Sequence, residues 1–339
     1  MRVLFLAGRE RTYARNEVLV RALRRFAAVD VIAPAAEPRS QWLASAQVAA
    51  RALPQLRGGY DLVVVGFYGH VIVQLLRRFW RGPLLFDAFV STYDTLCFDR
   101  RVYAPDSPPG RLAFWLDRSS CAAASHVLLD TQHHVRYFVA TFGLPAEHFT
   151  ALPVGCSEEI YAFQPLPPPG ACVQVLSYAT FLPLHGIETT LQAAALLRDA
   201  PIRLRLIGSG PLLEAMRALA LELQLDNVVF EPPVPPRALS AAIAAADICL
   251  GGHFGAGDKA ARVIPGKIYQ MLAVGRPVIA ADAPGNRELL RHGESAWLIP
   301  PADPAALAAA IRQLAADAGL RGRLAAGGQA AYAAQASEA

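Results

Sequence analysis

The chain has 339 residues, of which 54% are hydrophobic and 18% are charged, and its formal net charge is +4. This composition excludes an intrinsically disordered protein, because a chain of this length and hydrophobicity can bury the cores of two ordinary domains. The small net charge, without a basic repeat or a basic patch interleaved with aromatic residues, argues against a nucleic-acid partner.

Short β-rich runs alternate with longer helical patterns along the whole chain, which is typical of parallel α/β architecture. In the first half we expect strands at residues 2–7, 29–33, 61–65, 83–86, 126–130 and 149–153. In the second half we expect strands at residues 173–178, 203–207, 228–231, 247–250, 277–280 and 296–299. Helical patterns fill the gaps, for example at residues 16–26, 187–197, 212–225 and 305–315.

A proline-rich segment separates the two halves. Residues 163–170 contain four prolines and end in a glycine, so they hold no regular structure. We therefore predict two doubly wound, Rossmann-like domains, at residues 1–163 and 171–339, joined by a linker at 164–170. Ligands of such sheets bind beyond the carboxyl ends of the strands, so we expect a site in a cleft between the domains.

The cellular compartment follows from the cysteines and from the apolar segments. Five cysteines occur without a CxxC pair, and the first apolar run is too short for a signal peptide, so we expect reduced thiols in the cytoplasm. Residues 71–81 are apolar and end in arginines and a tryptophan. This pattern favours a core helix with a basic end, and the alternative is an interfacial helix at the inner face of a membrane.

A basic, glycine-containing segment of the second half is a candidate anion site. Its two lysines are the only ones among 32 Lys and Arg residues of the chain. These cations alternate with glycines just before a helical pattern begins, so free backbone N–H groups and a helix N-terminus would face the same ligand. The cations are Lys259, Arg262 and Lys267.

Turns after predicted strands supply further candidates. Gly208 and Gly210 follow the strand at 203–207, and their lack of a side chain permits close approach of a diphosphate. Gly8, in the equivalent turn of the first half, is a donor-binding candidate as well. A dehydrogenase fingerprint is excluded, because Leu213 occupies the third glycine position of GxGxxG.

His185 stands at the start of a predicted helix after the strand at 173–178, and we weigh a ligand role equally against an ordinary hydrogen-bonded residue. Asp87, at the end of a first-half strand, is the best-placed carboxylate for a general base, although such an aspartate more often caps a loop. We expect no metal, because the chain has no Asp-x-Asp pair and His133-His134 lacks a third ligand at useful spacing.

Several motifs in a fixed order resemble the donor-binding domain of family 4 glycosyltransferases, which have the GT-B fold. They lie at residues 207–211, 277–290 and 293–307, and the likeness covers nearly the whole second half. In the first half, residues 66–70, 86–91 and 130–131 are similar to acceptor-domain loops of part of that family. The resemblance implies transfer of a sugar from a nucleotide-diphosphate donor with retention of anomeric configuration, with the acceptor held by residues 1–163.

The chain departs from the family's pattern at several positions. The Arg and Lys that usually grip the diphosphate fall on Thr180 and His185, and the usual pair of glutamates falls on Arg262 and Gln270. Gln270 retains the ability to hydrogen-bond a ribose hydroxyl. We favour a subfamily in which Lys259, Arg262 and Lys267 supply the missing cations, and the alternative is a catalytically dead domain.

Glu288 is the remaining donor-binding candidate, as a ligand of a sugar hydroxyl. The resemblance implies a cytoplasmic hexosyltransferase without cofactor, whose partners are a nucleotide-sugar donor and a saccharide or lipid-linked acceptor of the cell surface. A non-catalytic nucleotide-sugar-binding or regulatory subunit and a sugar-nucleotide epimerase on the same fold remain alternatives. Fixed cations aimed at the leaving diphosphate would stabilise the transition state.

Overall fold

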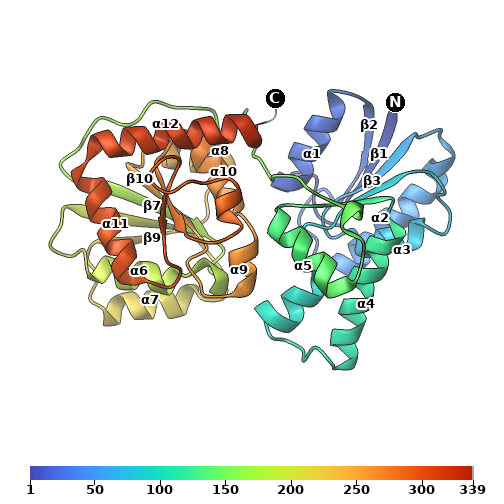
Figure 1. The fold of residues 1–339 in the computed structure, drawn as a ribbon, viewed down its shortest axis with the longest axis horizontal. Coiled ribbons are helices and arrows are strands. Elements are labelled where there is room, and N and C mark those ends of the chain that lie inside the picture. The colour runs from blue at the N-terminus through green and yellow to red at the C-terminus, as the bar shows by residue number, and fades with distance from the viewer. Residues whose placement is uncertain (338–339) are drawn as a thin grey trace. The chain divides into compact units, whose positions relative to one another are not determined.

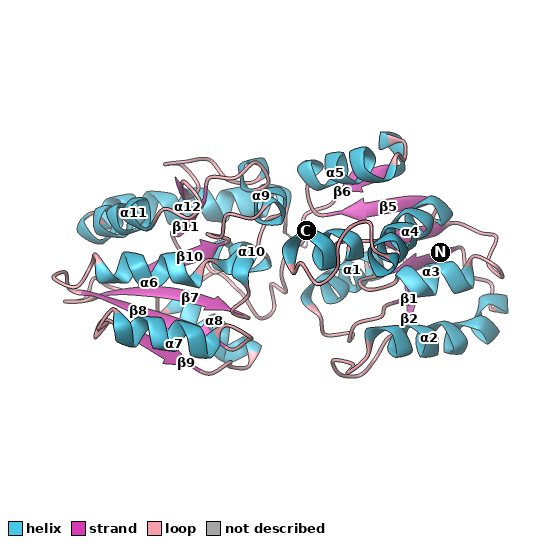
Figure 2. Cartoon of the chain, turned by 90° about the horizontal axis from the view of Figure 1, so that it is seen from below, coloured by secondary structure: helices cyan, strands magenta, loops and turns pink. Residues whose placement is uncertain are grey.

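The computed structural model describes residues 1–337, which form two compact units, Met1–Val154 and Gly155–Ser337. Within these residues each unit contains a parallel sheet of six strands (Figure 1). Helices connect successive strands within each sheet, and two further helices follow the last strand of the chain. Figure 2 distinguishes helices from strands by colour. Residues 338 and 339, the end of the second predicted domain, lie outside the described part.

The first unit has the strand order β2-β1-β3-β4-β5-β6. Its strands are β1 Arg2–Leu6, β2 Ala28–Ile32, β3 Leu62–Val65, β4 Leu84–Asp87, β5 His126–Leu129 and β6 Phe149–Ala151. Its helices are α1 Ala14–Arg24, α2 Gln41–Ala52, α3 His70–Leu76, α4 Pro108–Ala123 and α5 Gln132–Phe142, with the short helices η1 Leu53–Arg57, η2 Asp94–Asp99 and η3 Ala146–His148.

Both faces of this sheet are covered. Leu4 and Leu6 of β1 belong to a core formed with α2, α3, α4 and α5, whereas Val3 and Phe5 belong to a core formed with α1. Side chains alternate along a strand, so these consecutive apolar residues need an apolar layer on each side. The continuous apolar run of β1 is thus the sequence of a strand buried on both faces.

The second unit has the strand order β12-β11-β10-β7-β8-β9. Its strands are β7 Val173–Ala179, β8 Ile202–Gly208, β9 Val228–Glu231, β10 Ile248–Gly252, β11 Val278–Ala281 and β12 Trp297–Ile299. Its helices are α6 Ile187–Ala195, α7 Leu213–Glu222, α8 Pro236–Ala244, α9 Asp258–Arg262, α10 Gly266–Ala273, α11 Pro304–Ala316 and α12 Ala318–Gln335, with η4 Pro183–His185 and η5 Asn286–Glu288.

The strand orders place a topological switch point in each sheet. In the first unit β1 has β2 on one side and β3 on the other, and in the second unit β7 lies between β8 and β10. At such a point the loops that follow two adjacent strands run in opposite directions. A crevice therefore opens between these loops at the carboxyl ends of the strands. The loops after β1, β3, β7 and β10 are therefore where ligands are expected.

The structure confirms the predicted α/β architecture. Each of the twelve predicted strands is present with bounds shifted by at most two residues, and the four exemplified helices are α1, α6, α7 and α11. For residues 71–81 the core-helix interpretation holds over α3, where Ile72, Val73 and Leu76 are fully buried. Among residues 1–337, no helix combines the length and the apolar character needed to cross a membrane.

The division between the units differs from the predicted one. The units divide after Val154, whereas the sequence assigned residues up to 163 to the first domain. Residues 155–163 pack with the second unit, where the Cys156 thiol and the Glu158 carboxylate lie 3.3 and 3.1 Å from the Tyr332 hydroxyl. The sequence does not predict these contacts, because Tyr332 is about 175 residues away from Cys156 and Glu158 along the chain.

The proline-rich segment lacks helix and strand, as predicted, yet it is held in place. Buried Arg276 donates hydrogen bonds of 2.6 Å to the carbonyl oxygens of Gln164 and Pro165. The Phe163 ring packs on Gly275, where a side chain would approach it to 2.7 Å. The start of the segment is therefore fixed to the second unit by a buried arginine.

Candidate functional site

A pocket of about 430 Å³ lies in the second unit at the carboxyl edge of its sheet. The loops after β7, β8, β9 and β10 and the start of α10 form it, so it occupies the switch point beside β7. This volume is in the range of sites for small organic ligands. Its lining includes Tyr178, Thr180, His185, Gly208, Ser209, His253, Gly266 and Lys267.

Lys267 is the cation of this pocket. It is the second residue of α10, which begins after Pro265, and its side chain is almost fully buried. Its Nζ donates a hydrogen bond of 2.9 Å to the carbonyl oxygen of Tyr178 and lies 5.9 Å from the centre of the Tyr178 ring. Burial lowers the pKa of Lys267 to about 8. An anion entering the pocket would stabilise the charged ammonium and raise this pKa again.

Two histidines face each other beside Lys267. The ring centres of His185 and His253 are 5.5 Å apart. Burial, aided by the charge of Lys267, lowers the pKa of His185 to about 3, and burial lowers the pKa of His253 well below its ordinary value. Both imidazoles are thus neutral at pH 7. Nδ1 of His185 accepts a hydrogen bond from the Leu182 N–H at 3.1 Å, which leaves the proton on Nε2.

The loops that carry the two histidines depend on one glycine. Gly186 has φ +63° and serves both as the C-cap of η4 and as the N-cap of α6. A Cβ atom at this position would lie 2.5 Å from the backbone carbon of Phe254. Glycine therefore allows the loop after β7 to pack against the loop after β10, which brings His185 next to His253.

The two glycines of the predicted diphosphate turn have φ near +149°, a region that side chains rarely adopt. A Cβ atom on Gly208 would lie 1.9 Å from the Ala179 carbonyl oxygen, and one on Gly210 would lie 1.9 Å from that of Thr180. The turn after β8 thus lies directly against the loop after β7. Gly208 lines the pocket. Gly210 is absent from the lining and instead allows the turn after β8 to pack on the backbone of Thr180.

The structure does not bring all predicted cations into this pocket. Lys259 and Arg262 belong to α9, which ends before Pro265 starts α10, and neither residue lines the pocket. Lys259 lies close enough for its charge to help lower the pKa of His253. The cation supplied to the lining by this segment is Lys267, and contact of Lys259 or Arg262 with a donor stays a prediction.

Gln270 and Glu288 also lie outside the lining. Gln270 is nearly one turn after Lys267 on α10, and its Oε1 accepts a hydrogen bond of 2.6 Å from the Tyr178 hydroxyl. Its side-chain oxygen therefore supports the tyrosine that holds Lys267. Glu288 ends the short helix η5 after β11. The predicted contacts of both residues with ribose or sugar hydroxyls stay predictions.

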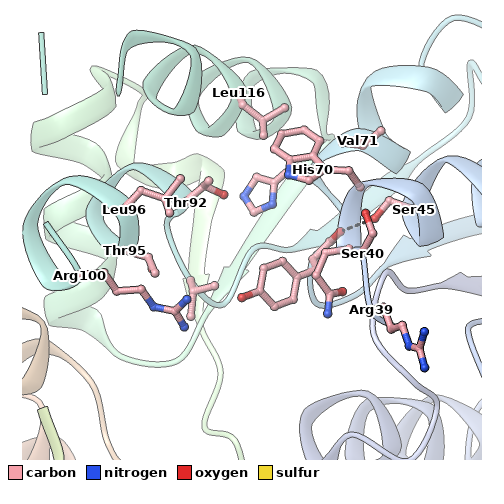
Figure 3. Close-up of a pocket in the computed structure, with 14 residues that line it drawn as sticks. Arg39, Ser40, Ser45, His70, Val71, Thr92, Thr95, Leu96, Arg100 and Leu116 are labelled. Atoms are coloured by element: carbon pink, nitrogen blue, oxygen red, sulfur yellow. Dashed lines mark hydrogen bonds between the residues drawn. The ribbon is translucent and has the colours of Figure 1, made fainter. Parts of the chain in front are cut away.

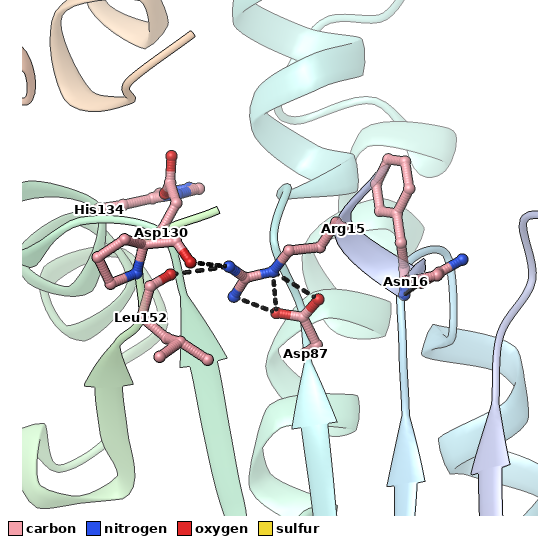
Figure 4. A network of polar contacts seen from close by, with 8 residues as sticks. Arg15, Asn16, Asp87, Asp130, His134 and Leu152 are labelled. Atoms are coloured by element: carbon pink, nitrogen blue, oxygen red, sulfur yellow. Dashed lines mark hydrogen bonds and ion pairs between the residues drawn. The ribbon is translucent and has the colours of Figure 1, made fainter. Parts of the chain in front are cut away.

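Asp87, the predicted general base, is enclosed in the first unit. Its carboxylate accepts hydrogen bonds from Arg15, with the shortest distance 2.8 Å, and both side chains are at most 1% exposed. Figure 4 shows the Arg15 guanidinium between Asp87 and Leu152, to whose carbonyl oxygen it also donates. A carboxylate held in this way orders the carboxyl edge of β4. This geometry argues against Asp87 as a base for an acceptor hydroxyl.

Gly8 lies at the switch point of the first unit. Its N–H donates to the Phe67 carbonyl oxygen at 3.0 Å, and a Cβ atom would lie 2.4 Å from the Tyr68 carbonyl oxygen. The loop after β1 therefore packs directly on the loop after β3. This contact accounts for a glycine at position 8 without a ligand, and its contact with a donor stays a prediction.

Sequence reasoning missed Tyr178 and His253 as site residues. The available signal for His253 was its position just after the buried strand β10, next to the switch point. Among residues 1–337, no group of three or more His, Cys, Asp or Glu side chains is arranged to hold a metal ion.

Comparison with known proteins places these features in context. Residues 173–317 match the family described as Glycosyl transferases group 1. The D-inositol 3-phosphate glycosyltransferase of Acidothermus cellulolyticus is 32% identical over 296 residues, which cover 79% of this chain and 62% of that protein. The amylovoran biosynthesis glycosyltransferase AmsK of Erwinia amylovora is 25% identical over 195 residues, 57% of this chain and 48% of that protein. The chain spans about half the length of most of the curated relatives it matches.

The fold is shared with solved structures. HepE of Anabaena, in a complex with UDP and glucose, superposes with a TM-score of 0.75 at 18% identity, over 100% of this chain and 96% of HepE. The two parallel sheets therefore confirm the predicted GT-B fold.

Proposed function

We propose that this protein transfers a hexose from a nucleotide-diphosphate sugar to a saccharide or lipid-linked acceptor, with retention and without a metal ion. The match of residues 173–317 to the group 1 glycosyl transferases and the GT-B fold of the chain support this proposal. The observation that carries the proposal is the pocket beside β7, where Lys267, His185 and Gly208 line one cavity. UDP in the HepE complex supports a nucleotide diphosphate as the ligand.

The residues of the pocket have complementary tasks in this reaction. When the bond between the sugar C1 and the diphosphate oxygen breaks, negative charge develops on the departing diphosphate. The Lys267 ammonium and the Nε2–H of His185 are the donors that would stabilise it. Removal of one such preorganised donor from a transition state costs about 2.7–4 kcal/mol.

The acceptor proton needs a destination as the new bond forms between the acceptor oxygen and C1. The Asp87 carboxylate forms a buried ion pair with Arg15, so we assign the acceptor proton to an oxygen of the departing diphosphate. A retaining enzyme of this kind needs no side-chain base, which agrees with the enclosed position of Asp87. The bond from C1 to the diphosphate oxygen would break, and the bond from C1 to the acceptor oxygen would form, on the same face of the sugar. The anomeric configuration would thereby be preserved.

The test is donor binding followed by turnover. The full chain is titrated calorimetrically with UDP-, GDP-, ADP- and TDP-sugars in the presence of EDTA, and the binding donor is then incubated with saccharide and lipid-linked acceptors. We expect micromolar binding of one donor and release of its nucleoside diphosphate only when an acceptor is present. Binding without any turnover would favour the regulatory subunit, and donor conversion without an acceptor would favour the epimerase.

A further inference from the structure

A second pocket, of about 350 Å³, lies entirely in the first unit (Figure 3). The start of α2, the start of α3, η2 and α4 form it, together with the loops after β3 and β4. It lies at the carboxyl edge of the sheet, where the loop after β3 leaves the switch point. The donor site described above leaves this pocket unused.

The charged residues that line this pocket are all basic. Arg39 and Arg100 line it from two different elements, and none of its described lining residues is acidic. Both arginines are exposed, and within residues 1–337 neither side chain has a carboxylate at ion-pair distance. The N-terminus of α2, at Ser40 and Gln41, adds the positive end of a helix dipole. A guanidinium group suits a phosphate, which accepts paired hydrogen bonds from it.

Two buried polar atoms of lining residues make no hydrogen bond within the described structure. They are Oε1 of Gln41 and Nε2 of His70. The His70 side chain is 4% exposed, and its Nε2 lies 3.2 Å from Oδ1 of Asp117 without the alignment of a hydrogen bond. Asp117 already accepts hydrogen bonds from the Ser91 hydroxyl and two backbone N–H groups. Unsatisfied buried polar atoms are costly, and Oε1 of Gln41, which is an acceptor, would be satisfied by a hydroxyl or another donor group of a ligand.

The floor of the pocket is preorganised. Tyr68 has φ +58°, a left-handed conformation that side chains other than Asn or Asp rarely adopt. The Ser45 hydroxyl donates a hydrogen bond of 3.0 Å to the Tyr68 carbonyl oxygen, and Gly8 packs so closely on this carbonyl that a Cβ atom at position 8 would lie 2.4 Å from it. Strained backbone held in this way is characteristic of ligand sites.

The remaining wall is apolar and continues to the surface. Trp42, Leu96 and Leu116 line the pocket, and Trp42 is 55% exposed. Phe98 on η2 and Trp115 on α4 are 49% and 54% exposed on the same elements. A purely polar sugar phosphate would leave this apolar surface in water, whereas an apolar chain attached to the phosphate would cover it.

We propose that this pocket binds the acceptor through an organic phosphate that carries an apolar chain, with Arg39 and Arg100 as ligands of the phosphate and Trp42, Leu96 and Leu116 as the wall for the chain. The inference rests on the proposed function, since it names the acceptor class of that reaction. Of the aromatic residues on α2, η2 and α4, Trp42 lines the pocket. Tyr93 and Trp115 are absent from its lining, and Tyr93 packs against Phe98 and Phe114.

The test uses octyl phosphate below its micelle concentration as the probe, titrated into the full chain with UDP present. Octyl glucoside has the same chain without the charge, and glycerol 3-phosphate has the phosphate without the chain. We expect octyl phosphate to bind at least about tenfold more tightly than either, because each lacks one of the two recognised groups. Equal affinity for octyl glucoside would overturn the phosphate site, and equal affinity for glycerol 3-phosphate would overturn the apolar wall.

Two substitutions locate the site. Arg39→Gln and Arg100→Gln are each expected to weaken octyl phosphate binding about tenfold or more, the value of one charge-assisted hydrogen bond. Arg111→Gln, at an exposed arginine of α4 outside the lining, is the matched control and is expected to bind as the unsubstituted chain does. Wild-type affinity in both pocket variants would overturn the proposal. UDP binding is measured in parallel. If the unsubstituted chain did not bind UDP, this result would contradict the proposed function and not the phosphate pocket.

Discussion

Nζ of Lys267 donates a hydrogen bond of 2.9 Å to the carbonyl oxygen of Tyr178, so the buried cation of α10 is attached to the carboxyl end of β7. The hydroxyl of the same tyrosine donates to Gln270, one position short of a full turn after Lys267 on α10. Tyr178 is therefore connected to α10 through both its carbonyl oxygen and its hydroxyl, and the ammonium is held at the switch point beside the two neutral histidines. A diphosphate bound there would meet a cation that is already positioned.

The first prediction concerns pH. The pKa of Lys267 is lowered to about 8 by burial, so the lysine is charged below pH 8 and neutral above it. Binding of UDP-glucose, whose diphosphate does not titrate in this range, should weaken progressively as the pH rises through about 8, towards tenfold per pH unit. His185, with a pKa of about 3, should add no step between pH 6 and 9. Calorimetric titration at several pH values measures the profile.

Lys267→Arg is the control for that profile. A guanidinium stays charged throughout this range, so any binding that the variant retains should be independent of pH near 8. A pH profile in this variant equal to that of the unsubstituted chain would assign the titration to another group.

The second prediction concerns the glycine turn after β8. Gly208→Ala would place a Cβ atom 1.9 Å from the Ala179 carbonyl oxygen at a φ of +149°. We expect a loss of more than about 1 kcal/mol in the free energy of unfolding, together with weakened UDP-glucose binding. Gly257→Ala is the matched control, because no atom lies within 4 Å of the Cβ it would add. Urea denaturation of both variants measures the difference, and equal stabilities would contradict the packing described.

The third prediction separates structure from catalysis at Asp87. Asp87→Asn leaves the Arg15 guanidinium buried without its counter-ion, which costs about 3–5 kcal/mol in the free energy of unfolding. Asp30→Asn breaks an exposed ion pair with Arg2, which solvent screens, and should change the free energy of unfolding far less. Denaturant unfolding measures both values. An Asp87→Asn protein of unchanged stability whose transfer rate had fallen a hundredfold would restore Asp87 as the base.

The strands could be predicted because each is a short apolar run bounded by turn residues, as in β1 and β3. The lining residues Thr180, His185, Gly208 and Lys267 could be predicted for a related reason, since each follows a strand end or begins a helix. These signals are local, so one sequence is sufficient to show them.

The remaining features depend on contacts between distant residues. Asp87 is a plausible base as long as its partner is unknown, and that partner, Arg15, is 72 positions away. His253 joins the site only because Gly186 lets two loops pack together. Lys259 and Lys267 are eight positions apart in the sequence, yet Pro265 separates their helices, and only Lys267 enters the described lining.

That contrast between the two lysines provides the most direct test of the donor site. UDP-glucose is titrated calorimetrically, at pH 7 with EDTA, into the unsubstituted chain, Lys267→Met and Lys259→Met. Loss of a charge-assisted hydrogen bond worth about 1.5–3 kcal/mol predicts at least about tenfold weaker binding for Lys267→Met, and Lys259→Met should change the affinity less than threefold. Equal affinity of all three proteins, or a larger loss in Lys259→Met, would contradict the assignment of Lys267 as the cation of the donor pocket.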